Sequence, residues 1–142
     1  MQIRRMLVAI SGAVIDPDVV SLAATIARPT KAEIRIVHVI EVPWNLALDA
    51  VLETALERGE ALLSAAAKVA QSTGVKVEIE LLQAREAAAA IVDTARERRS
   101  DLILLGMPYR RRLGKVYIGR TVQSVYTRAR CAVLAYRQEE PS

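Results

Sequence analysis

Short apolar segments alternate with helical segments along the chain, and this alternation most narrowly limits the possible folds. Five segments have the apolar or β-branched pattern of strands: residues 6–10, 33–40, 75–81, 102–105 and 131–136. Four segments between them carry helical signals: residues 16–28, 46–72, 86–99 and 120–128. Strands that alternate with helices form a mostly parallel sheet covered by helices on both faces. The sequence therefore predicts a three-layer α/β domain with a five-stranded sheet and four helices.

Local signals refine this prediction. Asp16 followed by Pro17 is typical of a helix start, so Asp16 is the predicted N-cap. Strict alternation over residues 75–81 favours an edge strand, whereas residues 102–105 are apolar on both faces and favour a central strand. Gly59 lies inside the long predicted helix, where it is expected to cost about 1 kcal/mol relative to alanine.

Size and composition favour one soluble domain. The chain has 142 residues, of which 52% are hydrophobic, enough for a proper core. Its apolar runs are far shorter than the roughly 20 residues that span a bilayer, and its N-terminal residues show no secretory signal. The single cysteine, Cys131, excludes an internal disulfide and is interpreted as a small core residue. We expect a cytoplasmic domain over residues 1–137 and a disordered tail at residues 138–142.

Positive charge is concentrated near the C-terminus. Residues 106–137 contain no acidic side chain and eight basic ones: Arg110, Arg111, Arg112, Lys115, Arg120, Arg128, Arg130 and Arg137. Such a segment in a chain of net charge +4 favours an anionic partner. The alternative is a solvated basic face that only aids solubility.

The segment from Gly106 to Thr121 joins the carboxyl end of a predicted strand to the start of a helix. Ligands of parallel sheets bind at this edge, and a helix N-terminus offers backbone N–H groups to a phosphate. Gly106 is interpreted as a residue that lets the backbone approach a ligand closely, and Arg120 adds a guanidinium. Neither a Walker A motif nor G-x-G-x-x-G is present. The segment predicts a phosphate site; the alternative is an ordered loop whose arginines cap carbonyls or form ion pairs.

The spacing Gly106-x-x-Tyr109, nine residues, Gly119-Arg120 resembles the nucleotide-binding motif of the universal stress protein superfamily. Four segments also resemble strand segments of that family: residues 6–10, 37–40, 101–106 and 129–134. The resemblance covers nearly the whole chain. It implies a Rossmann-like fold of the adenine nucleotide alpha-hydrolase type.

The resemblance also implies a nucleotide site at the carboxyl edge of the sheet. Carried over position by position, this site comprises Ala9, Ser11, Val39, Gly106, Met107, Tyr109, Gly119, Arg120 and Thr121. The chain departs from the family pattern at three positions. Ser11 stands where ATP-binding members have aspartate, Tyr109 replaces the second motif glycine, and Arg120 replaces the motif serine or threonine. The implied ligand is ATP, with Mg²⁺, or AMP; a cyclic dinucleotide is the alternative phosphate ligand.

These features predict a regulatory module rather than an enzyme, because no general base is placed for fast hydrolysis. The alternative is a dimeric stress- or transporter-associated interaction module without a nucleotide, since Pro108-Tyr-Arg-Arg-Arg also resembles a branch found attached to amino-acid transporters. Slow ATP hydrolysis and nucleic-acid binding are the remaining alternatives. The resemblance implies a homodimer through the last strand, Cys131–Tyr136, which is apolar on both faces.

Other candidate residues have simpler interpretations. His38, the only histidine, lies within a predicted strand and is interpreted as structural. A triad of Ser11, His38 and Asp101 is disfavoured, because Asp101 opens its strand at the opposite edge of the sheet. Trp44, which follows the second strand, is predicted to be either a lid over a base or a hydrophobic plug. Metal binding has no support in the spacing of ligand residues.

Overall fold

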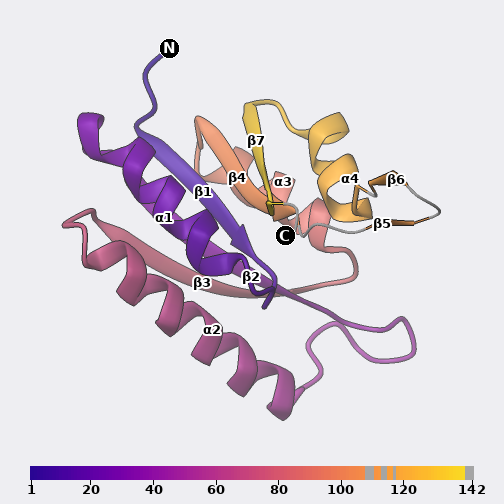
Figure 1. The fold of residues 1–142 in the computed structure, drawn as a ribbon. Helices are drawn as coiled ribbons and strands as arrows, with labels where there is room; N and C mark the ends of the chain where they lie inside the picture. The colour runs from indigo at the N-terminus through magenta and orange to yellow at the C-terminus, as the bar shows by residue number, and fades with distance from the viewer. Residues whose placement is uncertain (108–110, 113–114, 117, 140–142) are drawn as a thin grey trace.

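Five parallel strands form the main sheet, in the order β3-β2-β1-β4-β7 (Figure 1). The computed structural model describes residues 1–107, 111–112, 115–116 and 118–139. The strands of the main sheet are β1 (Arg5–Ile10), β2 (Glu33–Glu41), β3 (Val77–Ala84), β4 (Leu102–Met107) and β7 (Ala132–Arg137). The helices are α1 (Asp16–Ala27), the short 3-10 helix η1 (Arg28–Thr30), α2 (Glu53–Gln71), α3 (Ala87–Glu97) and α4 (Arg120–Arg128). The predicted α/β class is confirmed, as is the sheet with four α-helices.

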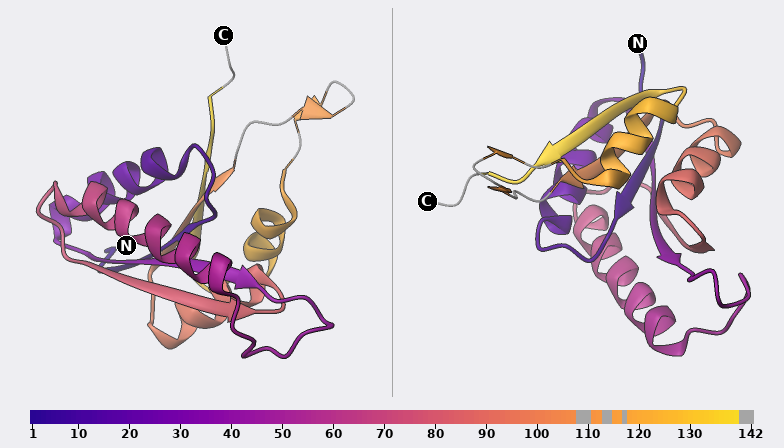
Figure 2. Two further views of the ribbon diagram at one scale, coloured as in Figure 1. Left: turned by 90° about the horizontal axis from the view of Figure 1, so that it is seen from below. Right: turned by 90° about the vertical axis from the view of Figure 1, so that its right-hand side faces the viewer.

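The sheet separates two helical layers, with α1 and α2 on one face and α3 and α4 on the other (Figure 2). Side chains alternate between the faces along each strand, so that Val8 joins the cluster under α1 and α2 while Leu7 joins the cluster under α3 and α4. Both are fully buried. Each helical layer therefore has its own apolar core, and the inner strands β1 and β4 are largely buried on both faces.

The predicted places of two strands in the sheet are confirmed. β3 lies at one edge, and β4 lies inside the sheet between β1 and β7. β3 begins two residues later than its alternation predicted, at Val77. The segment that follows β4, predicted as a loop, contains a short antiparallel pair of strands, β5 (Arg111–Arg112) and β6 (Lys115–Val116).

The long helix is shorter than predicted. It begins at Glu53 rather than near Leu46, because the preceding loop is held by side chains that follow it in the chain. Gln83 donates its side-chain amide to the carbonyl oxygens of Leu48 and Ala50 at 2.9 and 3.0 Å. Carbonyls engaged in this way are not free for helical hydrogen bonds, so the apolar spacing of residues 46–52 does not produce a helix.

The prediction that Asp16 is the N-cap of α1 is wrong. Ile15 occupies the cap position and Asp16 is the first helical residue. Its carboxylate accepts hydrogen bonds from the backbone N–H of Gly12 at 2.8 Å and of Ser11 at 3.4 Å. Asp16 thus orders the turn between β1 and α1 rather than the helix end.

The described part of the chain ends shortly after β7. The N–H of Gln138 donates to the carbonyl oxygen of Met107 at 2.9 Å. Residues 140–142, the rest of the predicted disordered tail after Glu139, lie outside the described residues. Among the described residues, no helix is long and apolar enough to cross a membrane.

Candidate functional site

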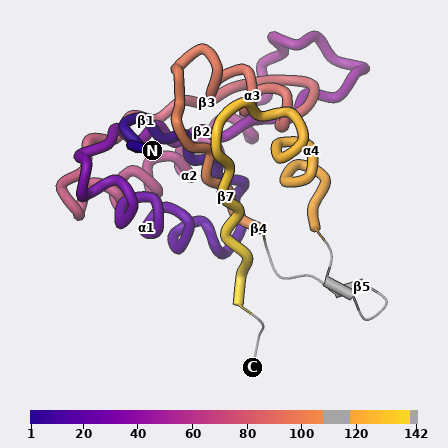
Figure 3. Tube along the Cα trace, turned by 90° about the horizontal axis from the view of Figure 1, so that it is seen from above, coloured from indigo at the N-terminus to yellow at the C-terminus, as the bar shows by residue number. Residues whose placement is uncertain are grey.

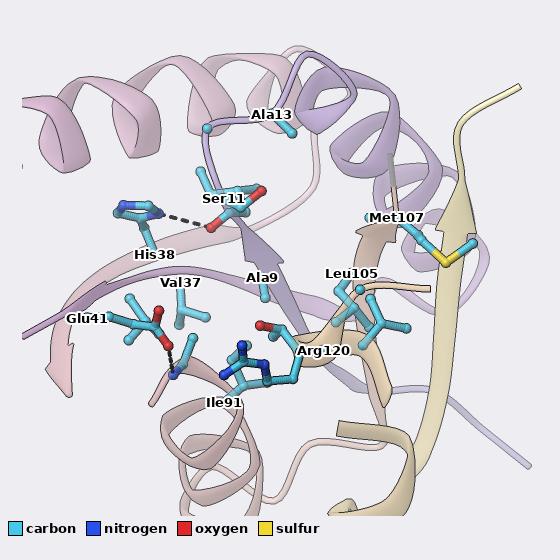
Figure 4. A pocket seen from close by; sticks show the side chains of 18 residues that line it. Ala9, Ser11, Ala13, Val37, His38, Glu41, Ile91, Leu105, Met107 and Arg120 are labelled. Carbon is cyan, nitrogen blue, oxygen red and sulfur yellow. Dashed lines mark hydrogen bonds between the residues drawn. The ribbon is translucent and has the colours of Figure 1, made fainter. Parts of the chain in front are cut away.

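A cavity of about 620 Å³ opens at the carboxyl ends of β1, β2 and β4 (Figure 4). Here β1 lies between β2 and β4. After β1 the chain adds β2 and β3 on one side of it, and then crosses to add β4 and β7 on the other side. Open α/β sheets place their ligand sites at such a reversal of strand order. The lining residues are Ala9, Ile10, Ser11, Gly12, Ala13, Val37, His38, Val39, Glu41, Ala87, Ile91, Leu105, Gly106, Met107, Gly119, Arg120, Thr121 and Val122.

One part of this cavity is apolar. Val37 and Leu105 come from the strands, and Ile91 comes from α3. All three are buried, with at most 3% of their surface exposed. A flat apolar group of a ligand would be removed from water between these side chains.

The N-terminus of α4 supplies positive charge to the same cavity. The N-cap is Gly119, so no side chain of the N-cap residue accepts the first N–H groups of the helix. The side chain of Arg120 points into the cavity, between Glu41 and Leu105 (Figure 4). Within the described part of the chain, its guanidinium has no hydrogen bond or ion pair. The first N–H groups of a helix and an unengaged arginine form a site suited to a phosphate or carboxylate.

The turn between β1 and α1 closes another side of the cavity and requires a glycine. Gly12 has φ +86, a left-handed conformation that favours glycine. A Cβ atom at Gly12 would also lie 2.6 Å from Nη2 of Arg58. Burial raises the pKa of Asp16, which holds this turn, above its ordinary value of 3.8, although its bonds to Gly12 and Ser11 and the nearby His38 oppose the shift.

His38 lines the cavity but is engaged by the backbone. Its Nδ1 lies 3.0 Å from the carbonyl oxygen of Ile10 (Figure 4). A carbonyl oxygen only accepts, so Nδ1 carries the proton of this hydrogen bond. The interpretation of His38 as a structural residue agrees with this contact.

Glu41 was missed by the sequence analysis. It is the last residue of β2, and its Oε2 accepts the N–H of Ala87 at 2.9 Å, at the start of α3. The carboxylate therefore both faces the cavity and holds α3 against the carboxyl edge of the sheet. Its position at the end of a strand was the available signal, because this edge was already the predicted ligand edge. Ala87 and Ile91, which α3 contributes to the lining, had no sequence signal that pointed to the cavity.

The structure gathers the predicted site residues around one cavity. Eight of the nine line it: Ala9, Ser11, Val39, Gly106, Met107, Gly119, Arg120 and Thr121. Tyr109 lies outside the described residues. Gly106 has a packing role as well, because a Cβ there would meet Ile15 and Val19 of the α1 layer at 2.8 Å. Close packing of α1 against β4 therefore favours glycine here, and close approach of a ligand stays a prediction.

Two other residues from the sequence analysis, Asp101 and Trp44, lie outside the cavity. Asp101 accepts the N–H groups of Arg4 and Arg5 at 2.8 and 2.9 Å, at the amino edge of the sheet, which confirms that it cannot join Ser11 and His38. Trp44 is 81% exposed and does not line the cavity, so the prediction of a hydrophobic plug is wrong.

The exposed indole of Trp44 instead packs with Arg85, whose guanidinium carbon lies 4.8 Å from the ring centroid. The same guanidinium donates to the carbonyl oxygens of Pro43 and Leu46 at 2.6 and 2.8 Å. Arg85 therefore ties the loop after β2 to the end of β3, beside the cavity.

Residues 2–137 match the model of the Universal stress protein family. The chain belongs to this family. A universal stress protein of Methanocaldococcus jannaschii is 26% identical over 141 residues, which are 95% of this chain and 82% of that protein. The resemblance drawn from the sequence is thus confirmed.

Solved structures of universal stress proteins share the fold. The protein from Archaeoglobus fulgidus in complex with dAMP has a TM-score of 0.75 at 22% identity, over 95% of this chain and 98% of that chain. A universal stress protein in complex with cAMP has a TM-score of 0.74 at 20% identity, over 98% of this chain and 100% of that chain. At these identities the likeness concerns the arrangement of strands and helices.

Proposed function

We propose that this universal stress protein is a regulatory module that binds an adenine nucleotide, or a related phosphate-bearing ligand, at the carboxyl edge of its sheet. The observation that carries the proposal is that one cavity combines an apolar slot, formed by Val37, Ile91 and Leu105, with Arg120 and the N-terminus of α4. A purine fits the slot, and a phosphate fits the cationic end. The complexes of two structural neighbours with dAMP and cAMP support the ligand class.

The charges of the cavity favour a ligand with one phosphate. Arg120 is the one arginine or lysine among the described residues that line it, and Glu41 adds a negative charge. A triphosphate would bring more negative charge than one arginine and one helix N-terminus offset. AMP or a cyclic monophosphate is therefore the proposed ligand, and ATP with Mg²⁺ is the competing one in the test below.

Glu41 is proposed to contact the nucleoside part of the ligand. Its Oε2 accepts the N–H of Ala87, and its second oxygen faces the cavity as a further acceptor. A carboxylate oxygen accepts hydrogen bonds from ribose hydroxyls and from an exocyclic amine. This role would replace the one implied for the aspartate that the family has at the position of Ser11.

Binding rather than catalysis is proposed. In the described cavity wall, Nδ1 of His38 is engaged by the carbonyl oxygen of Ile10, and Glu41 is engaged by the start of α3. Among the lining residues that the structure describes, neither side chain is hydrogen-bonded to the hydroxyl of Ser11 or Thr121, so no nucleophile is paired with a base there. The single cysteine of the chain fits the cytoplasm as the place of this regulatory role.

The test is a thermal-shift panel with AMP, cyclic AMP, ADP, ATP and cyclic dinucleotides, each with and without Mg²⁺. A ligand at 100 times its dissociation constant stabilises the fold by about 2.7 kcal/mol, which raises the melting temperature measurably. We expect AMP or cyclic AMP to give the largest shift. Arg120→Gln is expected to weaken this ligand about tenfold or more, because a charge-assisted hydrogen bond is lost.

The matched control is Arg28→Gln, which removes an equal charge from an exposed arginine at the end of α1, away from the cavity. Its ligand affinity should equal that of the unchanged protein. A shift that survives Arg120→Gln would refute the phosphate position. No shift with any compound would favour the second candidate, a dimeric interaction module. Its supporting observation is the largely apolar strand β7, which lies at an edge of the sheet and pairs with β4.

A further inference from the structure

A second cavity, of about 330 Å³, lies at the opposite edge of the sheet from the proposed nucleotide site. It is formed where α3 and α4 end and β7 begins, and these two helices lie side by side on one face (Figures 1 and 2). The lining residues are Val92, Asp93, Ala95, Arg96, Arg99, Ser100, Ile103, Arg128, Ala129, Arg130 and Cys131. Four arginines and one aspartate therefore surround a hollow large enough for a small molecule.

Two of these arginines are engaged by carboxylates. Arg96 pairs with Asp93 at 3.3 Å, and Arg128 pairs with Glu86 at 2.7 Å. The guanidinium groups of Arg99 and Arg130, by contrast, have no hydrogen bond or ion pair with any described residue. The cavity thus presents two guanidinium groups whose donors are not satisfied by the protein.

Arginines often lie near helix ends because their charge and donors suit the last carbonyl groups. Here no hydrogen bond joins the guanidinium of Arg99 or Arg130 to a carbonyl of a described residue, and backbone N–H groups serve some of the last carbonyls. The N–H of Arg98 donates to Thr94 at 2.9 Å, and the N–H of Ala129 donates to Val125 at 2.9 Å. Capping of helix ends therefore does not account for Arg99 and Arg130.

Arg99 occupies a position that favours glycine. It has φ +55, directly after the C-cap of α3, and its N–H donates to the carbonyl oxygen of Arg96 at 3.2 Å. The N–H of Ser100 donates to Ala95 at 2.9 Å, which completes the Schellman pattern of a helix C-terminus. A side chain at this left-handed position carries a conformational cost. From this position Arg99 lines the second cavity and also a neighbouring cavity beside Glu97 and Arg98.

We propose that this second cavity binds a compact phosphate-bearing anion, held by the guanidinium groups of Arg99 and Arg130. The forked donors of arginine match the oxygens of a phosphate, and two such groups suit a phosphate or a pyrophosphate. Asp93 and Glu86 offset the charges of Arg96 and Arg128, so the net positive charge comes from Arg99 and Arg130. The same chemistry is offered by an inorganic phosphate and by a phosphate ester of a small metabolite.

Cys131 makes the proposal testable. It lines the second cavity and is the only cysteine of the chain, so its reactivity reports on this site and not on the first. Burial raises the pKa of the Cys131 thiol, so alkylation is measured at mildly alkaline pH. The reagent is N-ethylmaleimide, because it is uncharged and is not itself attracted by the arginines.

Inorganic pyrophosphate, inorganic phosphate and glycerol 3-phosphate are each titrated at constant ionic strength, and the alkylation rate of Cys131 is followed by mass spectrometry. Saturable protection by at least one of them is expected. Protection by glycerol 3-phosphate but not by the inorganic anions would identify an ester as the ligand; the reverse would identify an inorganic anion. Calorimetry with the protecting anion gives the affinity independently.

Two variants test the named arginines. Arg130→Gln is expected to weaken the protecting anion about tenfold. Arg99→Gly is expected to weaken it similarly while leaving the melting temperature unchanged or higher, because glycine relieves the left-handed conformation. This combination separates a lost ligand contact from a damaged fold. Arg28→Gln and Arg120→Gln, which change the same charge elsewhere, should keep the protection.

Three results would overturn the proposal. The first is an alkylation rate that none of the three anions changes. The second is equal protection by sodium chloride at matched ionic strength, which would indicate screening alone. The third is protection that persists in both Arg99→Gly and Arg130→Gln.

Discussion

Gly106 lies at the rim of the first cavity, but its missing side chain is required by the helix packed against the sheet. A Cβ at this position would lie 2.8 Å from both Ile15 Cδ1 and Val19 Cγ2, in the buried core under α1. The sequence predicted that the strand ends before Gly106, although β4 continues through it to Met107. It did not show which neighbour demands the glycine, because the contact joins residues that are far apart in the chain.

Gly106→Ala is therefore expected to destabilise the protein by about 1–3 kcal/mol, the usual cost of an extra methyl group in a packed core. Urea denaturation measures the loss. The control is Gly119→Ala, since a Cβ there meets no atom within 4 Å and the φ of Gly119 is −61. That variant should lose no more than about 1 kcal/mol, from a poorer N-cap. Equal losses in both variants would contradict the packing explanation.

Asp101 joins two neighbouring strands at the amino edge of the sheet. Its Oδ2 accepts the N–H groups of Arg4 and Arg5, and its own N–H donates to the carbonyl oxygen of Arg5 at 2.8 Å.

In helix α2, the missing side chain of Gly59 lets the helix approach the sheet closely. A Cβ there would lie 2.7 Å from Leu81 and 3.2 Å from His38. The sequence indicated the cost of this glycine, and the element packing gives its reason.

The pH dependence of stability should carry a contribution from Asp101. The hydrogen bonds from Arg4 and Arg5 lower the pKa of this carboxyl below its ordinary value of 3.8. The unfolded chain then binds the proton more readily than the folded protein, so stability rises with pH in this range. The contribution is present above pH 3.8 and is lost as the pH falls through the lower folded value.

Asp101→Asn removes this dependence. We expect the variant to be less stable than the unchanged protein at pH 5 and the difference to shrink as the pH falls below 3.8. Because the carboxyl is largely exposed, the effect is modest and is reduced by salt. Urea denaturation across this range, at low and high salt, measures it. Parallel pH profiles for the two proteins would show that Asp101 contributes nothing through its charge.

At the scale of the whole molecule, the strand order leaves β7 as an edge of the sheet (Figure 3). Residues 132–136 of this strand are all partly exposed, although they are apolar. Val133 packs toward α3 and α4, and Leu134 packs toward the opposite layer. An apolar edge strand with unpaired backbone groups is suited to pairing with another chain.

The expected state in solution is a homodimer joined along β7, with twice the mass of the 15.6 kDa chain. Val133→Lys is expected to shift the protein to the monomer, because a charged side chain on an edge strand opposes pairing. Light scattering after size exclusion measures the mass. The control is Ile79→Lys, a partly exposed position on the other edge strand, which should leave the dimer intact. A dimer that survives Val133→Lys but not Ile79→Lys would assign the interface to β3 instead.

The sequence by itself determined the alternation of strands and helices, the edge strand β3, the internal strand β4, and the residues that follow the strands at the ligand edge. These features depend on local periodicity and on glycine spacing, which are read along the chain. Tertiary structure decided the rest. The start of α2 depends on Gln83 and the turn before α1 depends on Asp16. Arg99 and Arg130 meet at one cavity only because α3 and β7 are packed together, and such non-local contacts leave no periodic pattern in the sequence.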